Sequence, residues 1–529
     1  MCSSFRPLLP ALQAVAARCP RTKTWTSLRA YATEAAANYD YKPSHYGQPL
    51  FQSHPHLLRP NELTPGIPSE EYERRRKDLM DSLPSNSVVV LIAAPVKYMS
   101  GSIYKYRQAS DFWYLTGFEE PDSAVVLEKN SSSRGYRMTL FSSGKDSAKE
   151  KWEGPRTSFD DALNVFKADD ALTIKAFPAQ LRSMISLYSN VFIDLPQSPR
   201  KNARSTKSLL RYLSPPVNPR SEYETVVESL SSSRRKPLAP LIAQLRVFKS
   251  DCEQQVMRTA ADISGRSLAK TMRFTRPGIS ESALAAHFEY LCCLSGSQRL
   301  AYVPVVASGP NALIIHYTSN NQVVQDGEMI LMDAGCEYNG YASDITRSYP
   351  ANGFFTPPQR ELYSAVLSAQ KALVELCTEA EELSLHDLHR KSCDLLRQEL
   401  KQIGFTLHTG DLERVLYPHF LSHPIGIDLH ESSHSDRAEL YVVLIVSHSL
   451  DLKFTIHARL KAGMVITVEP GIYVPPTAQF PKHFHNIGIR IEDEVLVGEK
   501  YPVVLSVSAP KEIADIEGAC QGLLGLEPL

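Results

Sequence analysis

The chain has 529 residues, more than one ordinary domain holds, so two domains are expected. Its hydrophobic content of 43% and charged content of 22% are those of a soluble globular protein. A formal net charge of −1 gives no reason to expect a nucleic-acid partner. We also find no apolar run of the roughly 18–20 residues that a membrane-spanning helix needs.

The first segment, residues 1–31, contains five basic residues and no acidic ones, and it is rich in Ala, Leu, Ser and Thr. This composition is typical of a mitochondrial transit peptide, which predicts a mitochondrial protein, in the matrix, whose leader is cut off. Removal of the leader would lower the net charge from −1 to −6. Residues 32–64 contain several prolines and are expected to form an extended, poorly structured connector.

The first domain is expected to span residues 65–240 and to have an α/β fold. It opens with an amphipathic pattern over Glu70–Leu83, followed by strand candidates at Val88–Ala93 and Ser123–Leu127. Two stretches rich in Pro and Ser then mark the domain boundary: Ser214–Arg220 and Ser231–Pro240.

The second domain is expected to span residues 241–515. Three helices have clear start signals, namely a capping box of Ser250 and Glu253 with a helix to Arg273, Thr356-Pro357 with a helix to about Cys377, and Ser384 with a helix ended by Gly404. Four β patterns lie between and after them: Met329–Asp333, Tyr338–Arg347, Met464–Glu469 and Ile487–Val497. Helices that alternate with antiparallel hairpins predict an α+β domain with its helices on one side of a curved sheet.

Five residues in the last third of the chain suit metal binding: Asp333, Asp344, His423, Glu469 and Glu492. Four carboxylates and one imidazole favour two hard or borderline divalent cations, Mn²⁺, Co²⁺ or Zn²⁺ rather than copper. Two such ions close together generate hydroxide at neutral pH and polarise a carbonyl, which is the chemistry of a hydrolase.

The β patterns explain how these residues could meet. The strands Met329–Asp333 and Tyr338–Arg347 are joined by a short turn around Cys336–Asn339, so a hairpin could bring Asp333 and Asp344 together. Around Glu492, alternation places the polar residues Arg490, Glu492 and Glu494 on one face and the apolar residues Ile489, Ile491 and Val495 on the other. Any one of these carboxylates could instead form a structural ion pair, but the set favours a metal centre.

Several separated blocks resemble the pita-bread metallopeptidases, specifically the aminopeptidase P group and its mitochondrial branch of aminopeptidase P3 or intermediate cleaving peptidases. The similarity covers most of residues 65–515. It rests on the blocks at Tyr106–Leu127, WEGPRT, IIHYTSNN, LMDAGCEYNGYASDITR, HPIGIDLH, ITVEPGIYVP, GIRIEDEVLV and PKEIADIEGAC. The resemblance implies an N-terminal α/β domain followed by a C-terminal pita-bread domain of α+β class.

The resemblance also implies roles for the five residues. Asp333 would bind one metal ion only, and Asp344 and Glu492 would bridge both. His423 and Glu469 would complete the other site, with Glu469 also accepting a proton from the attacking water. Mn²⁺ is the expected cation.

Four further residues match the family's active site. His316 and His430 would donate hydrogen bonds to the scissile carbonyl oxygen or the tetrahedral intermediate. Arg490 would orient the carboxylates, and Tyr473 matches a site tyrosine. Without such a match, His419, His434, His448 and His457 are interpreted as structural. The first domain is expected to shape the cleft and to support a homo-oligomer, a dimer or tetramer.

These features predict a mitochondrial metalloaminopeptidase that hydrolyses the first peptide bond of peptides and imported proteins through metal-bound hydroxide. Xaa-Pro cleavage is the group's usual chemistry, and the mitochondrial branch also removes a bulky first residue. A prolidase-type dipeptidase and a non-catalytic pita-bread binding module are the alternatives. Since Arg29-Ala30-Tyr31-Ala32 resembles a processing site, the protein could remove its own Tyr31.

One segment departs from the family pattern. Between His430 and the block at 460–470, the chain is longer than its relatives by roughly twenty residues, within Ala438–Ala458. The segment is apolar and β-prone, which is hazardous for a solvent-exposed loop. The hypothesis is a translated intron; a genuine insertion would instead alter the entrance of the cleft.

Overall fold

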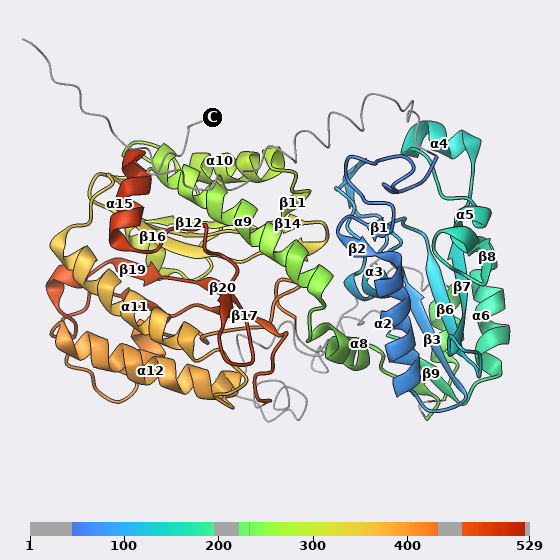
Figure 1. Cartoon of the computed structure of the whole chain (residues 1–529). Helices are drawn as coiled ribbons and strands as arrows, with labels where there is room; N and C mark the ends of the chain where they lie inside the picture. Colours follow the sequence, from blue (N-terminus) through green and yellow to red (C-terminus); the bar gives the residue numbers. More distant parts are fainter. Residues whose placement is uncertain (1–44, 195–221, 232, 432–457, 524–529) are drawn as a thin grey trace, which may run out of the picture.

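The computed structural model describes residues 45–194, 222–231, 233–431 and 458–523, which form two lobes (Figure 1). The predicted leader, the processing site at Tyr31, the Pro-rich stretch at 214–220 and nearly all of the segment 438–458 lie outside the described residues. Within the described ranges, no helix has the length and apolar composition needed to cross a bilayer.

The first lobe is built on a mixed six-stranded sheet. Its strand order is β10 (Arg235–Lys236), β9 (Asn190–Phe192), β3 (Ser87–Ile92), β6 (Ala124–Lys129), β7 (Tyr136–Ser142) and β8 (Asp170–Thr173). The β3–β6 and β6–β7 pairs are antiparallel, and the other three pairs are parallel.

Side-chain alternation explains how the sheet is covered. On β3, Val89 and Leu91 belong to the core that contains Leu79 of α2 (Ser69–Ser82). Val88 and Val90 instead face the core of Leu181 on α6 (Phe177–Ser186). The predicted helix Glu70–Leu83 and the two predicted strands of this lobe are thus confirmed to within two residues.

The described part of the predicted connector, residues 45–64, is packed rather than poorly structured. Leu50 and Leu63 are buried in the same hydrophobic core as Leu79, and β1 (Glu62–Thr64) pairs with β2 (Ile67–Pro68). The Gln48 side chain donates to the Gly117 carbonyl at 2.8 Å and accepts from the Glu119 amide at 2.8 Å. The prolines therefore interrupt regular structure here without preventing burial.

The predicted linker Ser231–Pro240 also contains structure. It contributes β10 to the edge of the first sheet and the start of α8 (Ala239–Arg246). Leu238 and Ile242 are buried in a hydrophobic core that includes residues of both lobes, such as Leu79 of the first and Ile425 of the second. The boundary that the sequence suggested at residue 240 therefore falls inside a helix.

In the described part of the second lobe, five long or medium helices surround several small antiparallel sheets. The helices are α9 (Asp251–Phe274), α10 (Glu281–Leu294), α11 (Pro357–Glu375), α12 (Leu385–Gln402) and α15 (Ile513–Gln521). In Figure 1 the strands lie between the α9–α10 pair and the α11–α12 pair. Capping boxes begin α9, α11 and α12 at Ser250, Thr356 and Ser384. The three predicted helix starts are therefore confirmed, although the sequence analysis identified a capping box only at Ser250.

The sheets that carry the site are short. They are β12 (Val305–Ser308) with β13 (Met329–Asp333) and β16 (Thr346–Pro350); β17 (Val465–Val468) with β20 (Asp493–Leu496) and β21 (Val503–Val504); β18 (Gly471–Val474) with β19 (Ile487–Arg490); and β11 (Arg299–Leu300) with β14 (Cys336–Tyr338) and β15 (Tyr341–Ala342).

Two predicted strands are wrong in detail. Tyr338–Arg347 is divided among β14, β15 and β16, so the predicted turn at Cys336–Asn339 is largely strand β14. Ile487–Val497 is divided into β19 and β20, because the chain passes from the β18 partner to the β17 partner at Ile491 and Glu492. Both interruptions fall at candidate metal ligands.

Candidate metal centre

Two aspartates meet at the end of the β13–β16 ladder. Asp333 is the last residue of β13, opposite Thr346, and Asp344 lies two residues before β16 begins. The Tyr302 hydroxyl bridges them, at 2.5 Å from Asp333 Oδ1 and 2.6 Å from Asp344 Oδ1. The two carboxylates are therefore close together, as expected, although the chain between them forms β14 and β15 rather than a simple hairpin turn.

The other three candidate ligands come from separate segments. His423 Nε2 lies 3.4 Å from Asp344 Oδ2 and 3.8 Å from Glu469 Oε1. Asp344, His423 and Glu492 each offer a ligand atom, and these atoms all lie within 4.8 Å of one another. The structure thus brings all five sequence-predicted ligands to one place.

These residues line a cavity of about 390 Å³. Of the nine residues singled out from the sequence, eight contribute to its walls: His316, Asp333, Asp344, His423, His430, Glu469, Arg490 and Glu492. Tyr473 does not, because its hydroxyl lies behind the wall and contacts Arg490. The other residues that line the cavity are mostly apolar and include Val305, Ile315 and Phe420.

The backbone fixes His423 beside Glu469. The amide of Thr467 donates to the His423 carbonyl at 3.0 Å, and the amide of Glu469 donates to the Leu421 carbonyl at 2.9 Å. His423 Nδ1 lies 3.1 Å from the Pro424 carbonyl, which places the ring proton on Nδ1. Nε2 therefore presents a lone pair to the carboxylates, the form a metal ligand requires. Burial lowers the pKa of His423 to about 4, so it is neutral at pH 7.

The carboxylates are crowded in a buried space. Burial, followed by mutual repulsion, raises the pKa values of Asp344, Glu469 and Glu492 well above their ordinary range. Such a cluster is costly unless cations neutralise it. Four carboxylates with one neutral imidazole match the donor preferences of Mn²⁺, Co²⁺ or Zn²⁺, so the residues present fit divalent metal ions.

Arg490 links the carboxylates to the rear of the site. Its guanidinium donates to Asp333 Oδ2 at 2.6 Å, to the Tyr473 hydroxyl at 2.7 Å and to Thr346 Oγ1 at 3.0 Å. The Thr346 hydroxyl donates in turn to Glu492 Oε2 at 2.6 Å. The arginine therefore orients one ligand directly and another through a threonine.

His419 was interpreted from the sequence as structural, but it lines the cavity. Its Nδ1 donates to the Phe420 carbonyl at 2.9 Å, which leaves Nε2 to accept from the Tyr473 hydroxyl at 2.9 Å. Burial lowers its pKa to about 3. Its position four residues before His423 is the only sequence signal that could have identified it. Tyr302, the second missed residue, lies in none of the recognised blocks.

The two remaining histidines flank the metal ligands. The His430 ring lies edge-on to the His423 ring, with 4.3 Å between centroids and an angle of 87°. Burial and the nearby Arg490 charge lower the pKa of His316. A neutral imidazole can still donate one N–H to a carbonyl oxygen in the cavity.

An N-terminal sheet domain precedes a second domain, in which buried carboxylates and neutral imidazoles surround a cavity. This architecture defines a metal-dependent hydrolase. Residues 255–499 match metallopeptidase family M24, and residues 72–192 match the N-terminal domain of aminopeptidase P. The chain belongs to the aminopeptidase P group of family M24 and is a metal-dependent aminopeptidase.

Relatives match along nearly the whole chain. The chain is 36% identical to intermediate cleaving peptidase 55 of Saccharomyces cerevisiae, covering 90% of this chain and 89% of that protein. It is 36% identical to Xaa-Pro aminopeptidase 3 of Rattus norvegicus, covering 90% and 91%. For the mitochondrial intermediate cleaving peptidase 55 of Arabidopsis thaliana the identity is 38%, covering 94% and 91%. The crystal structure of the yeast protein superposes with a TM-score of 0.73, at 35% identity, covering 87% of this chain and 99% of that chain.

Proposed function

We propose that this protein is a mitochondrial matrix aminopeptidase that removes one N-terminal residue from peptides and imported proteins. The convergence of Asp333, Asp344, His423, Glu469 and Glu492 on one cavity carries the proposal. The names of the yeast and Arabidopsis relatives, and the basic, acid-free composition of residues 1–31, support the role in protein processing and the location.

The five ligands would hold two divalent cations, for which we propose Mn²⁺. Asp333 would bind one ion, His423 and Glu469 the other, and Asp344 and Glu492 both. When bound, such a pair supplies a hydroxide nucleophile at neutral pH and polarises a carbonyl.

The protein's own side chains would perform the remaining steps. Glu469, whose Oε1 lies 3.8 Å from His423 Nε2, would accept the proton of the attacking water. His316 and His430 would donate hydrogen bonds to the oxygen of the scissile carbonyl as it gains charge. Arg490 would keep Asp333 in one orientation throughout, because its guanidinium is already bonded to that carboxylate and to Tyr473.

The test uses the purified full-length protein with Mn²⁺ and two peptides, one beginning Tyr-Ala and one beginning with a small residue followed by Pro. Mass spectrometry would follow the loss of the first residue. Removal of Tyr, abolished by a chelator, supports intermediate cleaving activity. Cleavage only before Pro indicates an ordinary Xaa-Pro aminopeptidase. An Xaa-Pro dipeptide is assayed in parallel, and cleavage of the dipeptide alone would indicate a prolidase and contradict the proposal.

A further inference from the structure

Arg246 lies where the two lobes meet and holds residues from both. It is the last residue of α8, and its side chain is 9% exposed. Its guanidinium lies 2.7 Å from Asp111 of the first lobe, on α3 (Ser110–Thr116). The same group lies 2.8 Å from Asp428 and 2.8 Å from Glu431, which belong to the second lobe. One buried cation therefore ties three carboxylates together.

The two second-lobe carboxylates flank His430 in the turn formed by residues 424–431. Glu431 is held at both carboxylate oxygens, since Oε1 also accepts from the Ile427 amide at 3.0 Å and Oε2 lies 2.8 Å from Lys249 Nζ. Its own amide donates to the Pro424 carbonyl at 2.9 Å. Asp428 Oδ1 accepts from the Ser110 hydroxyl at 2.6 Å. Backbone bonds tie the start of the turn to neighbouring strands, from Ile425 to the Val465 carbonyl and from Ala342 to the Gly426 carbonyl. Side chains hold the residues on both sides of His430 in addition.

The Glu431 carboxylate packs directly against Gly426 on the inside of the turn. A Cβ atom placed on Gly426 would lie 2.4 Å from Glu431 Oε1, so the carboxylate occupies the space that any other residue would need. The turn starts at Pro424, whose carbonyl accepts from His423 Nδ1, and ends beside His430. A shift of Glu431 would therefore move His430 relative to the candidate metal ligands.

We propose that Arg246 is a positioning residue that fixes His430 against the metal centre, and that Asp111 makes the first lobe part of this support. The inference rests on the proposed function, which gives His430 its contact with the reacting carbonyl. Arg246 would not touch substrate. Its planar guanidinium reaches Asp111 with one terminal nitrogen and both second-lobe carboxylates with the other, a geometry that a lysine cannot reproduce.

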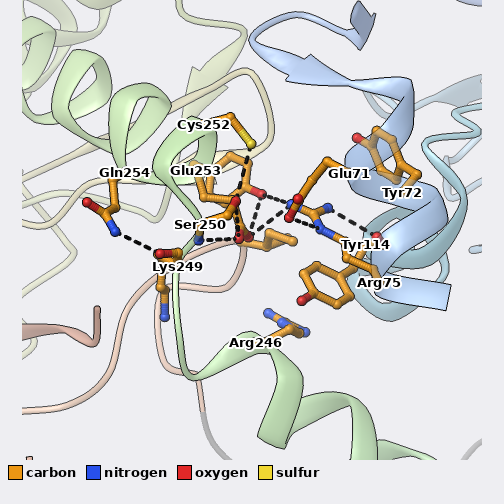
Figure 2. Close-up of polar contacts among 12 residues, drawn as sticks. Glu71, Tyr72, Arg75, Tyr114, Arg246, Lys249, Ser250, Cys252, Glu253 and Gln254 are labelled. Carbon is orange, nitrogen blue, oxygen red and sulfur yellow. Dashed lines mark hydrogen bonds and ion pairs between the residues drawn. The ribbon is translucent and has the colours of Figure 1, made fainter. Parts of the chain in front are cut away.

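A second buried cation between the lobes provides the matched control (Figure 2). Arg75 on α2 lies 3.1 Å from Glu71 and 3.1 Å from Glu253 on α9, and it donates to the Tyr114 carbonyl at 3.1 Å. Arg75 also donates to the Tyr341 hydroxyl at 3.2 Å, and none of these four partners belongs to the turn at 424–431. Tyr341 precedes Ala342, whose amide donates to the Gly426 carbonyl at 2.8 Å, so the pair approaches the turn only through that strand. Loss of the pair should therefore affect how the lobes pack without removing any side-chain contact of Asp428 or Glu431.

The experiment is a double-mutant cycle in kcat and KM, with saturating Mn²⁺ and a peptide that the wild-type protein cleaves. We expect Arg246→Lys to lower kcat by about ten-fold with little change in KM, because a displaced hydrogen-bond donor weakens the transition state more than the ground state. In the His430→Ala background, the same change should lower kcat by less than about two-fold, because the group being positioned is already absent.

Further variants at two positions make the test independent of folding defects. Asp111→Asn removes the charge of the first-lobe partner of Arg246 and leaves the contacts of Ser110 with Asp428 and of Arg107 with the Ile427 carbonyl in place. It should give a smaller fall in kcat that also disappears with His430→Ala. Glu253→Gln, which keeps a capping side chain on α9, should lower thermal stability and leave kcat within about two-fold. Asp111→Glu, which keeps the carboxylate, is expected to have a higher kcat than Asp111→Ala.

The possible failures can be separated. If the wild-type protein cleaves no peptide, the proposed function fails and the inference falls with it. If the wild-type protein is active but the effects of Arg246→Lys and His430→Ala multiply, the proposed function stands and the positioning role is wrong. If Glu253→Gln reproduces the kinetic effect of Asp111→Asn, the effect comes from general packing between the lobes, and the positioning role is again wrong.

Discussion

The site has two sides that are held in different ways. On one side, Asp333 and Arg490 lie in strands, and Asp344, Glu469 and Glu492 lie within two residues of a strand. Asp333 is paired in register opposite Thr346, and the Glu492 amide donates to the Thr346 carbonyl at 3.0 Å. On the other side, His316, His419, His423 and His430 lie in loops. We refer to these as the strand side and the loop side.

The difference shows what holds each kind of residue in position. A residue in a ladder is placed by backbone hydrogen bonds that do not depend on its side chain. A loop residue depends on specific neighbours, such as the Pro424 carbonyl for His423 or the Tyr473 hydroxyl for His419. We therefore expect strand-side substitutions to remove chemistry without moving the backbone, and loop-side function to respond to changes in neighbouring residues.

The largest effect is expected on the strand side from Asp344→Asn. Loss of a ligand shared by both proposed ions should lower kcat/KM by about 10³-fold or more and reduce bound Mn²⁺, measured by peptide cleavage and elemental analysis. The metal-free variant should melt at a higher temperature than the wild type, because one member of a mutually repelling buried cluster becomes neutral.

The neighbouring Asp493→Asn is the control for that prediction. Asp493 is equally buried, but Arg347 and Lys511 each lie 2.6 Å from it and hold its pKa below the usual range against the effect of burial. Its neutralisation should lower the free energy of unfolding by about 3 kcal/mol. If both variants shift the melting temperature of the metal-free protein in the same direction, the repulsion assigned to the cluster is wrong.

On the loop side, His316→Ala should lower kcat/KM by about 10²-fold with little change in Mn²⁺ content, since it removes a hydrogen-bond donor and no ligand. Steady-state kinetics and metal analysis of the same sample would check both statements. His408→Ala, a change at an exposed loop histidine, should behave like the wild type. A loss of metal from the His316 variant would instead make that histidine part of the metal site.

The next effect joins the two sides. Tyr302→Phe removes the hydroxyl that bridges Asp333 and Asp344, and should weaken Mn²⁺ binding by about ten-fold in calorimetric titrations. Tyr473→Phe breaks contacts to Arg490 and His419 but touches neither aspartate, so its effect on Mn²⁺ affinity should be smaller. Equal effects would mean that the bridging hydroxyl has no special importance for the ligands.

The same division explains what the sequence could predict. The strand-side ligands sit in short apolar runs that anticipate β13, β17 and β20, and capping residues such as Ser250 and Thr356 mark the helices by local chemistry alone. Tyr302 and His419 could not be predicted in this way, because their roles depend on contacts between segments distant in sequence. Packing of the connector around Leu50 also depends on a partner surface that no local pattern reveals.

The smallest effect concerns the support behind the loop side. His389 of α12 stacks on Phe420, with 4.4 Å between ring centroids, and burial lowers its pKa to about 4. In the unfolded chain its pKa is near 6.5, so between about pH 6.5 and 4 the unfolded state binds a proton that the folded state does not. Stability must therefore fall as the pH falls, by up to about 1.4 kcal/mol per pH unit.

Urea unfolding at pH 7.0 and pH 5.0 would measure this dependence. The buried Nδ1 of His389 has no hydrogen-bond partner among the described residues, so protonation would add a buried charge without a compensating contact. His389→Gln should be less sensitive to acid than the wild type, whereas the exposed His483→Gln should keep the wild-type slope. If the free energy of unfolding of His389→Gln falls with pH as steeply as that of the wild type, the acid sensitivity belongs to other groups and not to His389.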